Sequence, residues 1–194
     1  MTPTIGIPPR YVRLALDHAE DRNESFKQLE SYQNRLKNED RHPEIDNLIG
    51  AVGEIAFGIY ADLQINPEVY DSGDSGVDFH VSIDDEEYTM DMKTRTGDLF
   101  AFWVKEHKIQ ADYYVLGKLE APVNFDTNDL EDLETYGGWE VELLGVATKE
   151  ELLDARGIES DKGWVNRLIL LDDLDPVLSL SRSNSETGLR EGSG

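Results

Sequence analysis

The segment from Glu44 to Leu63 constrains the fold most, because nearly all of its side chains are apolar or small. Apolar residues recur at the three- and four-residue spacing of a buried helical face: Ile45, Leu48, Ile49, Val52, Ile55, Ala56, Ile59 and Leu63. The opposite side carries Gly50, Ala51, Gly53, Gly58 and Ala61. We therefore predict a central buried helix whose glycines allow another element to approach closely.

Glu54 is the only charged residue between Leu48 and Ala61, in a chain of which 30% of the residues are charged. Burying a carboxylate is costly unless it is paired, hydrogen-bonded or bound to a metal. The alternative is that Glu54 lies on the less apolar side of the helix and faces solvent.

A hairpin is predicted next, because residues 77–83 and 88–94 alternate between apolar and polar side chains. We expect a register that pairs Ile83 with Tyr88. Asp78 then lies opposite Lys93, and Asp91 shares their face. Two carboxylates and an ammonium group on one face can bind Mg²⁺ and stabilise charge. The alternative is a solvent-exposed salt bridge between Asp78 and Lys93, which contributes about 0–1 kcal/mol.

The remaining pattern predicts an α/β (α+β) domain with a mixed central sheet flanked by helices. Further helices are expected over residues 9–37 and 149–155, the latter begun by a capping box of Thr148 and Glu151. Further strands are expected over residues 111–119, 139–147 and 164–171. We expect one domain over residues 1–180 with its core at 44–175, an acidic insertion at 124–138 and a flexible tail at 181–194.

Composition limits the classes of protein to which the chain can belong. It has no cysteine, which excludes disulfides, zinc knuckles and thiol catalysis. No apolar run approaches the ~20 residues that cross a bilayer. The first ten residues lack the features of a signal peptide, so we expect a cytoplasmic protein and no membrane partner.

The net charge of −23 opposes binding to a nucleic acid in dilute salt. In molar salt, however, the Debye length falls to ~3 Å and surface repulsion is largely screened. The acids are spread along the chain and only 8 lysines are present, so we expect a halophile or one of its viruses as the source.

One stretch departs from this acidity. Five cations and three carboxylates lie between Lys93 and Lys118. The candidate contacts to DNA phosphates there are Arg95, Lys105, His107 and Lys108, which could equally be solvated surface residues. The tryptophans at 103, 139 and 164 could stack on bases, although most tryptophans pack in the core or at its edge.

Three short motifs occur in order: Gly53-Glu54, Gly76-Val77-Asp78-Phe79 and Asp91-Met92-Lys93-Thr94, followed by the strand at 111–115. Together they resemble the PD-(D/E)xK nuclease superfamily, which implies a restriction-endonuclease-like core. The resemblance covers about residues 48–119. The chain departs from the usual pattern by having aspartate where glutamate is commoner before x-Lys, and by lacking a proline before Asp78.

The resemblance implies specific roles. Asp78 and Asp91 would ligate Mg²⁺ or Mn²⁺ together with the backbone carbonyl of Met92, and Glu54 would reach the metal directly or through water. Lys93 would orient or help to deprotonate the attacking water, or neutralise charge that develops on phosphorus. We therefore expect a metal-dependent endonuclease or exonuclease that acts on DNA, with a homodimer as a further expectation. The alternatives are a noncatalytic binding or assembly module that keeps the nuclease fold, and an acidic protein that mimics DNA.

Overall fold

The computed structural model of the protein describes residues 2–26, 43–63, 76–83, 86–121, 138–161 and 163–177. The helices are α1 (Pro9–Phe26), α3 (Pro43–Tyr60) and α5 (Lys149–Asp154), with 3-10 turns η2 (Glu106–Lys108) and η3 (Leu171–Asp173). The strands are β1 (Thr4–Gly6), β2 (Phe79–Ile83), β3 (Glu86–Arg95), β4 (Ala101–Lys105), β5 (Tyr113–Glu120), β6 (Glu140–Thr148), β7 (Arg156–Glu159) and β8 (Val165–Leu170).

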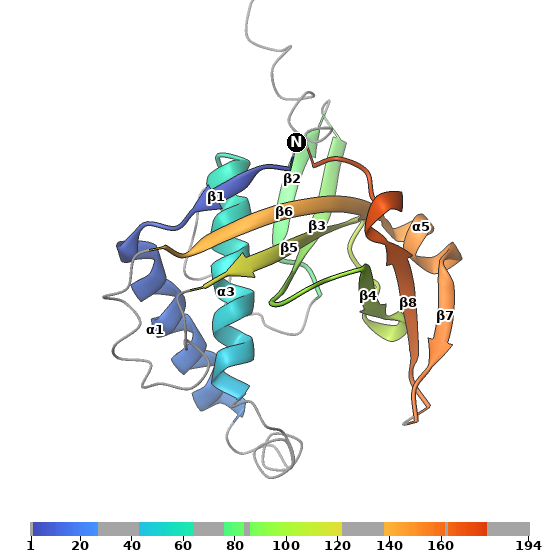
Figure 1. Ribbon diagram of the computed structural model, residues 1–194, viewed down its shortest axis with the longest axis horizontal. Coiled ribbons are helices and arrows are strands. Elements are labelled where there is room, and N and C mark those ends of the chain that lie inside the picture. Colours follow the sequence, from blue (N-terminus) through green and yellow to red (C-terminus); the bar gives the residue numbers. More distant parts are fainter. Residues whose placement is uncertain are drawn as a thin grey trace, which may run out of the picture.

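The strands form two sheets (Figure 1). The main sheet has the order β1-β6-β5-β3-β2 and is mixed, because β3 and β5 run parallel while its other pairs are antiparallel. The small sheet has the order β4-β8-β7 and is antiparallel throughout. The prediction of a mixed α/β domain, with a mixed sheet flanked by helices, is therefore confirmed.

The main sheet separates two hydrophobic clusters. On one face, Met90 and Met92 of β3 pack with the apolar residues of α1 and α3. On the other face, Tyr114 and Leu116 of β5 pack with β4, α5 and neighbouring segments. Figure 1 shows this order, with α1 and α3 on one side and the small sheet on the other. Residues on β3 thus alternate between the helical layer and the small-sheet layer.

Several predicted elements are confirmed with small changes of boundary. The central helix is α3, which begins at Pro43 and ends at Tyr60, two residues before Asp62 takes a positive φ of 53°. Helix α5 begins with the predicted capping box, in which Glu151 N–H donates to the Thr148 hydroxyl and Thr148 N–H donates to the Glu151 carboxylate. The predicted first helix is present as α1 to Phe26. Its continuation to residue 37, most of the acidic insertion and the tail at 181–194 lie outside the described residues.

The predicted hairpin register is wrong by two residues. Ile83 pairs with Glu86 rather than with Tyr88, and His80 pairs with Thr89. Two residues therefore lie between the paired positions, where four were expected. A shift of two residues keeps every side chain on its original face, whereas a shift of one would have inverted the hairpin.

Three strands were not predicted, namely β1, β4 and β7. Each is five residues or shorter, and β7 contains Gly157 and two charged ends. Such short segments show too little alternation to be recognised from the sequence.

Gly53 sets the distance between α3 and β3. A Cβ atom at this position would lie 1.6 Å from the Thr94 hydroxyl oxygen and 2.8 Å from the Thr94 Cβ. The prediction that glycine allows a close approach is thus confirmed at this position. Because Glu54 follows directly, the contact also brings the lone carboxylate of α3 next to β3.

We expect Gly53→Ala to lower the free energy of unfolding by about 1–3 kcal/mol, which is the usual cost of overpacking a core. Rotating Thr94 does not relieve the clash, because its Cβ and Cγ2 also lie within 3.1 Å. Gly50→Ala on the same helix is the matched control, since its Cβ would meet nothing closer than 3.9 Å. That variant should be neutral or gain up to about 1 kcal/mol from helix propensity. Urea unfolding of both variants in molar KCl tests this, and equal midpoints would contradict it.

None of the helices within the described ranges is long and apolar enough to span a membrane.

Candidate active site

Asp78 precedes β2 and is anchored to β3 through two hydrogen bonds. Its backbone N–H donates to the Met90 carbonyl at 2.8 Å. Its carboxylate oxygen Oδ2 accepts from the backbone N–H of Met92 at 2.7 Å. The carboxylate therefore takes the place of a backbone acceptor where β2 and β3 separate, and its position along β3 is fixed.

Asp91 is the most buried carboxylate of this group, with 1% of its surface exposed. Its Oδ1 atom accepts a hydrogen bond from the Lys93 ammonium group, two residues along β3. Its Oδ2 atom is buried and accepts no hydrogen bond from any described residue. The Asp78 carboxylate lies within hydrogen-bonding reach of Asp91. Two ionised carboxylates repel each other at that range, so a cation beside them is favourable.

Glu54 reaches the same region from α3 and is 5% exposed. Arg22 of α1 holds it through both carboxylate oxygens, at 3.0 Å to Oε2 and 3.2 Å to Oε1. Asp78 and Lys93 also lie close enough to act on the Glu54 charge. The alternative of a solvent-facing Glu54 is therefore wrong.

Arg22 is not among the residues that the sequence predicts for the site. The indication was present in the spacing. Val12, Ala15, Leu16 and Ala19 form the buried stripe of α1, and residue 22 continues that stripe by one further step of three. A charged residue at such a position requires a buried partner, which here is Glu54.

Burial raises the pKa of both central carboxyl groups to about 7. For Glu54 the largest cause is burial, to which the Asp78 charge adds, while Arg22 opposes the shift. For Asp91 the largest cause is again burial, opposed by Lys93 and reinforced by Asp78. Near neutral pH each group can therefore hold or release a proton with little driving force either way, which suits acid–base chemistry.

These shifts predict how stability depends on pH. A carboxyl group whose pKa is higher in the folded than in the unfolded chain binds its proton more tightly when folded. The stability that this tighter proton binding contributes is fully present below about pH 4, which is the pKa of the group in the unfolded chain. It is lost as pH rises through about 7, which is the pKa in the folded chain. We expect the Tm of the metal-free protein to fall between pH 5 and pH 8. The fall should be shallower in Asp91→Asn, and equal slopes would contradict the assignment to this pair.

No group of three or more histidine, cysteine, aspartate or glutamate side chains is arranged to hold a metal ion within the described part of the chain. The donors present are the Asp78–Asp91 pair, with a buried oxygen on Asp91 that lacks a hydrogen-bond donor. Mg²⁺ commonly binds through one or two carboxylates and keeps several waters. The residues therefore fit Mg²⁺ or Mn²⁺ better than a metal that needs a complete protein cage. Met92 contributes its backbone N–H to Asp78, and ligation by its carbonyl stays a prediction.

The candidate DNA contacts lie on β3, β4 and η2. Arg95 follows on β3 and lies within the electrostatic reach of Asp91. Lys105 is exposed at the end of β4. His107 and Lys108 lie in η2, where the His107 ring is 4.7 Å from that of Trp164. Of these residues, Arg95 lies nearest to the site in the sequence, two residues after Lys93 on β3.

Comparisons with known proteins identify no relative: no family model, no curated protein and no solved structure matches the chain.

Proposed function

We propose that the protein is a Mg²⁺- or Mn²⁺-dependent nuclease that hydrolyses DNA phosphodiester bonds, with Glu54, Asp78, Asp91 and Lys93 in its active site. The observation that carries the proposal is the convergence of these four residues from α3, the start of β2 and β3. The sequence predicts the same four residues from their chemistry and order. Their arrangement supports the proposal because the helix carboxylate of Glu54 lies near Asp78 and Lys93, and Asp78 lies near Asp91.

The chemistry follows from the residues. Asp78 and Asp91 would hold a divalent cation, which when bound would supply positive charge to a phosphoryl oxygen and lower the pKa of bound water. Lys93 keeps its ammonium group beside Asp91 and is 28% exposed, so it can reach an incoming phosphate from the open side. Glu54 can accept a proton near neutral pH, because its pKa is about 7. Arg22 positions Glu54 and need not touch the substrate.

Cleavage of linear, circular and branched DNA in molar KCl tests the proposal. We expect cutting that requires Mg²⁺ or Mn²⁺ and that stops with EDTA. The pattern of products separates exonuclease from endonuclease activity. If the folded protein cuts none of these substrates at any salt concentration, the result would favour a noncatalytic binding module. In that case the ion pair of Arg22 with Glu54 would have a structural role.

A further inference from the structure

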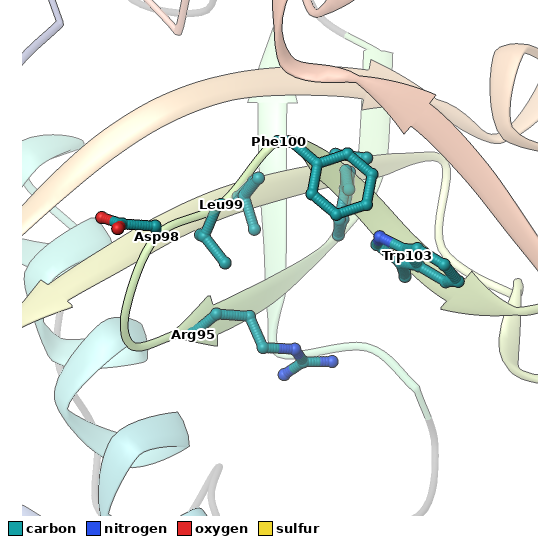
Figure 2. Close-up of a pocket in the computed structure, with 8 residues that line it drawn as sticks. Arg95, Asp98, Leu99, Phe100 and Trp103 are labelled. Carbon is teal, nitrogen blue, oxygen red and sulfur yellow. The ribbon is translucent and has the colours of Figure 1, made fainter.

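A pocket continues from the candidate active site along β3. Arg95 lies two residues after Lys93 on the same face of the strand, and it lines this pocket together with Leu99, Phe100 and Trp103. The pocket has a volume of about 120 Å³, below the ~300–1,000 Å³ of pockets that enclose a whole ligand, so it can take only part of one. Figure 2 shows the two aromatic rings next to each other and the Asp98 carboxylate on the far side of Leu99 from them. The pocket is thus lined by one cation, one carboxylate and two exposed rings, on the strand that carries Asp91 and Lys93 and on the segment that follows it.

The aromatic rings of the pocket are exposed. Phe100 is 67% exposed and Trp103 is 38% exposed. Their ring centroids are 6.0 Å apart in an edge-to-face arrangement, so each ring keeps part of its π face open. Exposing two large aromatic side chains is unfavourable in water unless a ligand covers them.

The outer face of the small sheet extends this surface. Strand pairing places Leu168 opposite Trp103 and Arg156 opposite Leu168, and paired residues project to the same side. The next row on this face is Lys105, Asn166 and Ile158. These two rows contain two cations and no carboxylate, although the chain has 41 acidic and 18 basic residues. The face is therefore complementary to an anionic partner.

We propose that this surface binds a single-stranded segment of the DNA substrate, whose bases stack on Phe100 and Trp103 and whose phosphates contact Arg95 and Lys105. The inference rests on the proposed nuclease function and names its substrate class. Aromatic rings interleaved with cations are the means by which proteins hold single strands, at about 1–3 kcal/mol for each stacked base. The substrate would be a DNA with an overhang, a flap or a melted end that reaches from the pocket to Asp91 and Lys93.

A single strand fits better than the other anionic or apolar partners. In a duplex the bases are stacked on each other, so their faces cannot cover Phe100 and Trp103. A protein partner would cover the apolar side chains, but only an acidic one would match the cations. A second copy of this chain is itself acidic, with a net charge of −23, so dimerisation through this face is one of the outcomes that the test below distinguishes.

Binding of a fluorescein-labelled oligodeoxythymidylate to the full chain in EDTA tests the inference without cleavage. We expect Phe100→Ala and Trp103→Ala each to weaken binding about 10-fold or more. Trp103→Phe keeps a ring and should stay within about 3-fold of the wild type. Leu153→Ala is the control, because Leu153 is 39% exposed and lies on α5, outside the pocket and outside both rows of the face. It should change the affinity by less than about 2-fold.

Three outcomes would overturn the inference. The first is wild-type affinity in both alanine variants while they remain folded by circular dichroism. The second is a duplex that competes for the site as well as the single strand. The third is a wild-type dimer that becomes a monomer in Trp103→Ala without any oligonucleotide binding, which would make this face a self-interface.

The same proteins separate this inference from the proposed function. Stacking-dependent binding without cleavage after addition of Mg²⁺ would support the single-strand surface and contradict the nuclease. Metal-dependent cleavage that is indifferent to Phe100 and Trp103 would support the nuclease and contradict the single-strand surface.

Discussion

Replacement of Asp91 by asparagine is expected to lower the rate of DNA cleavage by about 10³-fold, equivalent to about 4 kcal/mol of transition-state stabilisation. Asparagine keeps the size of the side chain but removes the negative charge that would hold a divalent cation. The same change should not destabilise the metal-free protein at pH 8. Because burial raises the pKa of Asp91 to about 7, the ionised form carries a desolvation cost that an amide does not. Lys93 keeps access to water after losing its partner.

This combination distinguishes a metal site from a structural ion pair. Mg²⁺ at 100 times its dissociation constant should stabilise the wild type by about 2.7 kcal/mol, and the Asp91→Asn variant far less. Thermal unfolding with Mg²⁺ or EDTA measures both effects. Asp154→Asn, which makes the same charge change at an exposed residue of α5, is the matched control and should leave activity within about 2-fold. Full activity in Asp91→Asn would move the active site elsewhere, and a large loss of metal-free stability would make the Asp91–Lys93 pair structural.

The central helix and the hairpin could be predicted because their periodicity is local. The helical spacing from Ile45 to Ile59 and the alternation from Met90 to Lys93 each report directly on a buried face. The site residues on them could be found because Glu54 contradicts its apolar surroundings. The prediction that Asp78 and Asp91 share one face holds despite the shifted register, because a shift of two residues leaves each side chain on its original face of the sheet.

Contacts between distant segments could not be predicted in the same way. The Arg22–Glu54 pair joins two helices, and spacing alone indicates that Arg22 requires a partner without identifying it. The small sheet depends on pairing β4 with β8, which are separated by β5, β6, α5 and β7 in the sequence. The residues that flank each tryptophan in the sequence do not show that Trp103 is exposed whereas Trp139, which precedes β6, is buried. The aromatic pocket therefore emerges only from the tertiary structure.

Replacement of Arg22 by alanine is expected to destabilise the protein by about 3 kcal/mol at pH 8, because it leaves Glu54 buried without its cation. Arg22 is 18% exposed and Glu54 6%, measured on the side chains, so little water can replace the lost partner. Arg22 lowers the pKa of Glu54, and its removal should raise that pKa further above about 7. Glu54 would then be protonated in the folded state near neutral pH. The destabilisation should accordingly shrink as pH falls to 5.

A double-mutant cycle isolates the pair. Glu54→Gln removes the charge that Arg22 neutralises, so the Arg22→Ala/Glu54→Gln variant should recover most of the stability lost in Arg22→Ala, with a coupling of about 2–3 kcal/mol. Arg13→Ala is the matched control on the same helix, because the Arg13–Asp17 pair has side chains that are 52% and 51% exposed. Its cost should be below about 1 kcal/mol. Urea unfolding in molar KCl at pH 5 and pH 8 measures each value. Equal losses in Arg22→Ala and Arg13→Ala would mean that water reaches Glu54, in which case its raised pKa could not arise from burial and its part in the chemistry would have to be assigned differently.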